Sequence, residues 1–190
     1  MTSTLTSASG WLRWAAAPLA LVGSSLLVWQ ASTAAFSATT DNGPNNWTAG
    51  TVALTDNDSG TAMFTATGLK PGDSGTRCIT VTYSGSLAAA VKLRASASGT
   101  LGSHLTLTVE QGSGNAPAAC TGFVSESTIY SGTVAGLAST ASTFGTGVGT
   151  FAPTGTGQAK SYRFVYTVQD NQAAQGTTAT ATFTWEAQNS

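Results

Sequence analysis

The sequence predicts an all-β fold, a jelly-roll or immunoglobulin-like β-sandwich of eight or nine strands. Two observations lead to it: apolar and polar side chains alternate along most segments, and turn residues separate these segments at short intervals. Only 8% of the residues are charged, against about 25% in an average globular chain, and Gly, Ser, Thr and Ala take their place. The 190 residues are enough for one domain once a targeting segment is removed.

Residues 1–34 have the features of a signal peptide, which would form a helix and then be cleaved off. Arg13 is the only charged residue in this stretch, and the apolar run at 15–29 is short for a membrane span. The positions that a signal peptidase recognises are occupied by small side chains. We therefore expect cleavage between Ala34 and Ala35. A permanent N-terminal membrane anchor is the alternative.

The mature domain would be residues 35–190. It begins with a short β-prone segment at 35–40, and a turn-rich linker continues to residue 45. The next segments predict a strand at 46–55, with a glycine inside it at a bulge, and a third short strand at 62–67.

The central stretch holds a tight turn followed by a strand. Pro71-Gly72 suits the middle of a type II turn, because proline presets φ and glycine accepts a positive φ. Ile79, Val81 and Tyr83 then alternate with threonines, which is the period of a strand with one buried face.

The same alternation predicts the later strands, at 89–96, 105–110, 128–130, 161–169 and 178–185. A short helical turn is expected at 134–138. The Gly/Thr/Ser-rich run at 139–157 is predicted to be an exposed connection that Phe144 and Phe151 anchor.

Two cysteines, Cys78 and Cys120, are present in the chain. In a secreted protein they most simply form one disulfide, which would contribute about 4 kcal/mol of stability for the loop that it closes. Two free buried thiols are the alternative. A zinc site would need more ligands than two cysteines and the single His104 supply.

Little else in the sequence indicates chemistry. Asp56 and Asp58 resemble the start of a calcium loop, but Thr67 stands where such a loop has its bidentate glutamate, and the same residues also form turns. Three glutamates that could pair in a glycosidase are more simply solvent-facing: Glu110, Glu126 and Glu186. No cofactor motif is present, and the net charge of −1 does not favour nucleic acid or an anionic membrane as a partner.

Four stretches together resemble the TasA/camelysin family of bacterial secreted proteins, whose signal peptides are removed by a dedicated signal peptidase. They cover both ends of the mature chain in the right order, while 101–160 shows no resemblance. The stretches are Ala34-Ala35-Phe36-Ser37, the segment 46–54, Leu69-Lys70-Pro71-Gly72-Asp73-Ser74 with Ser84-Gly85-Ser86-Leu87 after its strand, and Asp170-Asn171 with Gln175-Gly176 and 183–188. The cysteine pair is not typical of the Bacillus members and resembles an actinobacterial-type branch.

This resemblance implies a jelly-roll sandwich and a structural protein of the cell surface or biofilm matrix. In the best-known members, the N-terminal strand of one subunit completes the sheet of the next, so the partner is another copy or another matrix protein. The donor strand implied here comprises Ala35, Phe36, Ser37, Ala38, Thr39 and Thr40. The alternative is that this segment folds onto its own domain or is disordered. The membrane is involved only through the signal peptide before cleavage.

Two further functions remain open from the sequence. The first is an extracellular adhesin or a carbohydrate- or protein-binding module that does not polymerise. Its platform would be aromatic, although strand alternation places most of the candidates inward: Trp47, Trp185, Tyr130, Tyr162 and Tyr166. The second is a secreted metallopeptidase, as the name camelysin suggests, but no metal-ligand motif carries over to this chain, and catalysis is not expected.

Overall fold

The computed structural model describes residues 37–40 and 52–189, the first of these ranges by its backbone alone. The chain divides between Ala35 and Phe36 into two units, and all described residues belong to the second. The predicted signal peptide, its cleavage site and Phe36 therefore lie outside the described residues. Within the described part, no helix is long and apolar enough to cross a membrane.

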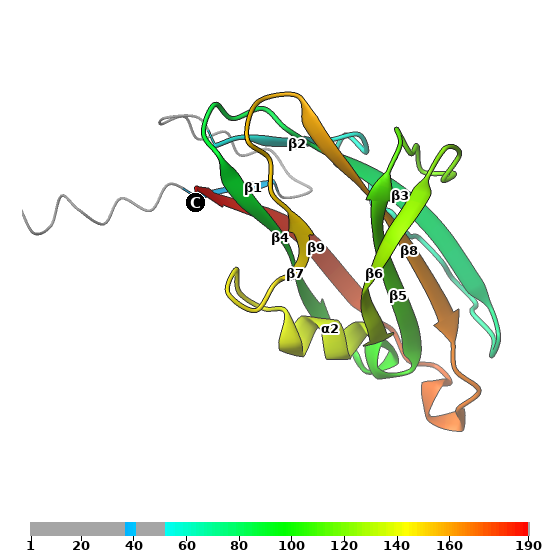
Figure 1. Cartoon of the computed structure of the whole chain (residues 1–190). Helices are drawn as coiled ribbons and strands as arrows, with labels where there is room; N and C mark the ends of the chain where they lie inside the picture. Colours follow the sequence, from blue (N-terminus) through cyan, green and yellow to red (C-terminus); the bar gives the residue numbers. More distant parts are fainter. Residues whose placement is uncertain (1–36, 41–51, 190) are drawn as a thin grey trace, which may run out of the picture. The chain divides into compact units, whose positions relative to one another are not determined.

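The described residues form two antiparallel sheets packed as a β-sandwich (Figure 1). This confirms the predicted all-β class. One sheet has the order β1-β9-β4-β7, with strands Ser37–Thr40, Thr180–Asn189, Ala89–Ser98 and Val148–Phe151. The other has the order β2-β3-β8-β5-β6, with strands Leu54–Asp56, Ser74–Tyr83, Gln158–Val168, Leu105–Ser113 and Val124–Thr133.

The core lies between the sheets and follows the predicted alternation. Ile79, Val81 and Tyr83 of β3 are at most 1% exposed, and Tyr162 of β8 is fully buried. Across the interface, the Trp185 ring of β9 packs against the Tyr162 ring with their centroids 5.2 Å apart. Burying large aromatic side chains from both sheets contributes to the stability of the sandwich.

The predicted helical turn is the short helix α2, Val134–Thr140. It begins at Thr133, whose hydroxyl accepts a hydrogen bond from the Gly136 amide at 3.0 Å. This cap satisfies one of the backbone donors that the first turn of a helix leaves free. Val134 and Leu137 are buried, so the helix closes one end of the core.

The predicted turn at Pro71-Gly72 is also confirmed. The Asp73 amide donates to the carbonyl of Lys70 at 3.0 Å, and Gly72 has a φ of 84°. A positive φ at the third residue is what a type II turn requires. The turn directs the chain into β3.

Several strand predictions were wrong. No strand forms at 62–67, because this segment inserts Met63 and Phe64 between the sheets and has no strand partner among the described residues. From the strand expected at 46–55, the described part retains only β2. The connection at 139–157 contains a strand that its glycines concealed, β7, which carries the buried anchor Phe151. The strand expected at 128–130 is much longer, because β6 begins at Val124.

Candidate assembly edge

The most N-terminal described segment, β1, forms one edge of the four-stranded sheet. It pairs antiparallel with β9 over four positions, from Ser37 opposite Gln188 to Thr40 opposite Trp185. On its other side β9 is paired with β4 along its whole length. The predicted donor segment, as far as it is described, therefore lies as an edge strand on its own domain.

The register of β1 covers only the C-terminal part of β9. It ends at Trp185, and no described strand pairs with 180–183 on the side away from β4. A sheet edge presents backbone donors and acceptors that can pair with another strand. This edge of β9 is thus partly occupied by β1 and partly without a strand partner among the described residues.

The edge of β3 in the other sheet is covered by three successive elements. β2 pairs with Val81–Tyr83, and the next outward-facing amide, that of Thr80, donates to the side-chain oxygen of Asn57 at 2.9 Å. The Cys78 amide then donates to the carbonyl of Ala118 at 3.3 Å. Because these groups are already satisfied, this stretch of β3 is closed to an incoming strand.

Ala118 belongs to the loop between β5 and β6, and the predicted disulfide holds this loop in place. Cys78 and Cys120 are bonded, with their Cα atoms 5.0 Å apart. On its way the loop crosses the outer face of the sheet, where the Ala116 amide donates to the Thr80 hydroxyl at 3.1 Å and the Ser161 hydroxyl donates to the Gly114 carbonyl. Thr80 and Ser161 are buried by this cover, although they face away from the core.

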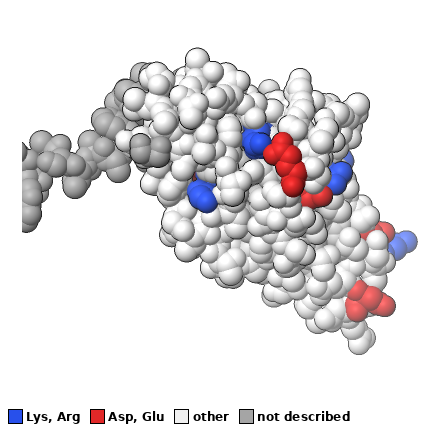
Figure 2. Space-filling model, viewed as in Figure 1, with Lys and Arg blue, Asp and Glu red and all other residues white. Residues whose placement is uncertain are grey.

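The outer edge of the five-stranded sheet, β6, is interrupted and charged. Its pairing with β5 shifts register twice, and bulges of this kind disfavour the addition of another strand. Lys160 binds Glu126 at 2.8 Å, and Arg163 binds Glu110 at 2.5 Å. Figure 2 shows charged side chains gathered over β5 and β6, with a few others elsewhere on the same face.

The three glutamates considered for catalysis each form an ion pair with a different basic side chain. Glu186 binds Arg94 at 2.6 Å, in addition to the two pairs above. The hydrogen bond from Arg163 holds the pKa of Glu110 below its usual value, and that from Lys160 does the same for Glu126. The expectation that all three glutamates face solvent is wrong for Glu110 and Glu186, whose side chains are only 17% and 13% exposed.

The weak calcium candidates, Asp56 and Asp58, lie in a turn. The Asp58 carboxylate accepts from the Gly60 amide at 2.9 Å, and the Asp58 amide donates to the Asp56 carboxylate at 3.3 Å. Burial, with a further contribution from Asp56, raises the pKa of Asp58 to about 6. Among the described residues, no group of three or more His, Cys, Asp or Glu side chains gathers in a way that could hold a metal ion.

The aromatic residues considered as a binding platform are directed into the sandwich. Tyr162 and Trp185 are buried, and Tyr166 packs edge-on against Phe64 with the ring centroids 5.1 Å apart. Tyr130 is half-buried, and its hydroxyl donates to the Thr133 carbonyl at 2.7 Å. These four residues serve as core residues, and Trp47 lies outside the described part of the chain.

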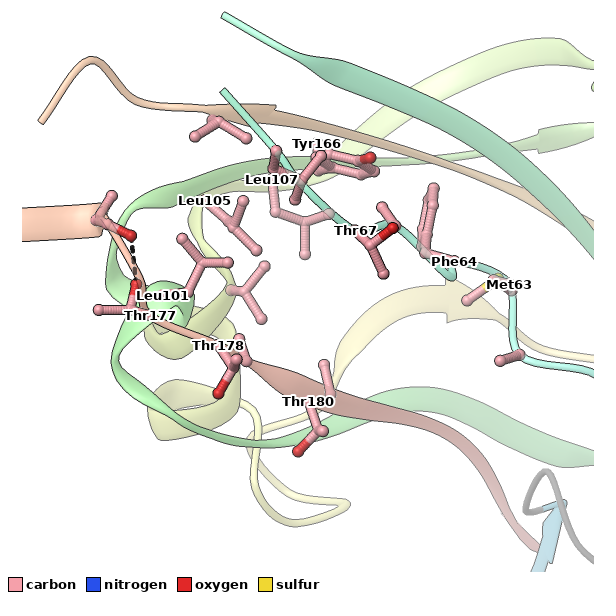
Figure 3. Close-up of a pocket in the computed structure, with 18 of the residues that line it drawn as sticks. Met63, Phe64, Thr67, Leu101, Leu105, Leu107, Tyr166, Thr177, Thr178 and Thr180 are labelled. Carbon is pink, nitrogen blue, oxygen red and sulfur yellow. Dashed lines mark hydrogen bonds between the residues drawn. The ribbon is translucent and has the colours of Figure 1, made fainter. Parts of the chain in front are cut away.

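A cavity between the sheets was not predicted from the sequence. Its volume is about 760 Å³, and it opens between the first half of β9 and the segment before β3 (Figure 3). Many of its lining residues belong to two connections, at 58–71 and 171–179, whose packing against the strands does not follow from the sequence pattern.

No protein-family model matches this sequence, and none of the curated proteins matches it.

Proposed function

We propose that this chain is a secreted structural protein of the bacterial cell surface or matrix, which assembles into fibres by exchanging β1 between copies. In a fibre, β1 of one copy would pair with β9 of the next, in the register that it has on its own β9. The observation that carries the proposal is the pairing of β1, which would lie close to the N-terminus after the expected cleavage, with this edge of the sheet. The resemblance to the TasA/camelysin family supports the same function.

The pairing of β1 with its own β9 is weak enough for β1 to exchange between copies. It pairs over four residues, and each backbone hydrogen bond contributes only about 0.5–1.5 kcal/mol in water. Residues 41–51 join β1 to the rest of the chain, and a connection of this length can reach about 35 Å when extended. The same pairing can therefore form within one copy or between two.

Two edges of the other sheet are protected against an added strand, which favours addition at β9. The edge of β3 is covered by Asn57 and the disulfide-held loop, and β6 is bulged and charged. Donor and acceptor surfaces differ in this arrangement, so the contact is head-to-tail and propagates instead of closing. Each copy would accept one strand and donate one strand.

Cysteines at paired positions distinguish exchange from folding back. Ser37 and Gln188 are opposite each other, at a Cα separation that antiparallel strands hold within the range of a disulfide. We expect the S37C/Q188C variant, oxidised after assembly, to give a ladder of covalent oligomers on a non-reducing denaturing gel. Electron microscopy of the same sample should show filaments.

The matched control is S37C/Q175C, because Gln175 is exposed and lies outside the register of β1. It should give no ladder. A single oxidised monomer from S37C/Q188C would show that β1 stays on its own domain, and a product that stops at the dimer would show a reciprocal, closed swap. Either result would overturn the fibre proposal.

A further inference from the structure

The two halves of the space between the sheets are filled to different extents. Along β9, the inward-facing Trp185 and Ala187 are buried, whereas Phe183 is half-buried and Ala181 is exposed. On the facing sheet, Phe164 is fully buried but Tyr166 is partly exposed. Protein interiors are normally packed without voids, so the open half is a distinct feature of this fold.

This open half is the cavity of about 760 Å³, which is within the usual range for small-molecule sites. Figure 3 shows its three walls: Met63, Phe64 and Thr67 on one side, Leu101, Leu105 and Leu107 on the second, and Thr178 and Thr180 on the third. The lining includes four leucines together with Met63, Phe64 and Phe183. Such a surface gains free energy when an apolar molecule displaces water from it.

The charges at the cavity restrict the ligand further. Among the described residues that line it, Asp58 is the only charged one, and none is Lys, Arg or His. A carboxylate or phosphate that entered would lose hydration without finding a cation, and Asp58 would repel it. The rim offers threonine hydroxyls and backbone groups, although the Thr177 hydroxyl already donates to the Ala174 carbonyl at 2.6 Å.

We propose that this cavity binds a neutral molecule with an alkyl chain, which lies between β9 and the Leu101–Leu105–Leu107 wall with its polar end at the rim. The inference is independent of fibre assembly, because the lining residues are not part of the β1 register except for Trp185. It adds a ligand-binding role to a protein for which a structural role is proposed above.

The test uses the protein as the cell produces it and the neutral dye Nile red, whose fluorescence rises in apolar sites. We expect one dye molecule to bind per chain. At pH 8, 1-dodecanol should displace the dye at a concentration at least tenfold lower than dodecanoate does. The two competitors have the same chain length and differ in head-group charge, so the ratio measures the preference for a neutral ligand.

Two variants fill the cavity from opposite walls. Ala181 and Ala66 are both exposed and line it, so Ala181→Trp and Ala66→Trp should each weaken dye binding at least fivefold. The control is Ala159→Trp, because Ala159 is an exposed strand residue that does not line the cavity. It should bind the dye as the unchanged protein does.

Three results would overturn the inference: no saturable dye binding, equal competition by the alcohol and the carboxylate, or unchanged binding in both cavity-filling variants. Circular dichroism checks that each variant is folded. The two variants change different segments of the chain. If one of them misfolds, dye binding by the other still tests the inference.

Discussion

Cys120 is bonded to Cys78 across 42 positions of sequence, and the bond brings the loop after β5 to the edge of β3. The Ala118 carbonyl then accepts the Cys78 amide, and the Thr80 hydroxyl accepts the Ala116 amide. The disulfide therefore has two effects: it restricts the conformations of the unfolded chain, and it closes a sheet edge in the folded protein. In a protein proposed to assemble through β9, a second open edge would permit branching and irregular aggregation.

Removing the disulfide should cost stability and also expose this edge. For Cys78→Ser combined with Cys120→Ser, we expect the free energy of unfolding to fall by about 4 kcal/mol, as the length of the closed loop predicts. Urea denaturation measures the change. Hydrogen exchange should also accelerate at the amides of positions 78 and 80. The first amide donates to the loop itself, at Ala118, and the second donates to Asn57, whose side chain is held by the loop at Ala116.

The control for this prediction is the unchanged protein under reducing conditions, which should lose about the same stability as the double variant. A loss below about 1 kcal/mol in both would contradict the prediction, and would mean that the hydrogen bonds hold the loop without the covalent bond.

A second prediction concerns the bulged pairing of β5 with β6. Gly112 lies on β5 where the register shifts, and a Cβ there would clash with the Val124 carbonyl oxygen and lie 2.9 Å from the Phe123 ring. The Val124 oxygen is backbone and cannot move alone. Gly112→Ala should therefore lower the free energy of unfolding by about 1–3 kcal/mol, measured by urea denaturation.

The matched control is Gly155→Ala. A Cβ at Gly155 meets nothing within 4 Å, and its φ is not positive, so the change should be neutral or slightly stabilising. Equal effects of the two substitutions would show that the close approach at Gly112 relaxes without cost.

Much of the fold could be predicted from the sequence because the side-chain period of a strand is local. Ile79, Val81 and Tyr83 alternate with polar residues, and the structure buries them as expected. The segment 62–67 has a similar composition but forms no strand, because strand formation needs a neighbour whose position is set elsewhere in the chain. The converse holds for β7. Its glycine-containing sequence does not predict a strand, but pairing with β4 makes it one.

The candidate sites were harder to predict, because each depends on contacts between distant segments. Ala181 and Ala187 occupy equivalent inward positions on β9, yet one lines an open cavity and the other is buried. The difference lies in what faces them, which sequence alternation does not contain. Likewise, the two cysteines indicated a bond, but not that its loop would cover Thr80 and Ser161.

The third prediction separates the half-buried ion pair from the exposed one on the same sheet. The Glu110 side chain is 17% exposed and accepts from Arg163, whereas Glu126 is 43% exposed and accepts from Lys160. Glu110→Gln should lower the free energy of unfolding at pH 7 by about 1–2 kcal/mol, because a charge-assisted hydrogen bond is lost. Glu126→Gln, the matched control, should cost less than about 1 kcal/mol, because solvent screens the pair.

The pH dependence of the Glu110 effect has a definite sign. Its pKa in the folded protein lies below the ordinary value of 4.5, mainly because of the hydrogen bond from Arg163. The stabilisation is therefore fully present above the ordinary pKa and disappears as the pH falls through the lower folded value. Urea denaturation of the unchanged protein and the Glu110→Gln variant should show a difference at pH 7 that shrinks towards zero under strongly acidic conditions. A difference that stayed constant with pH would attribute the loss to packing and not to the charge of Glu110.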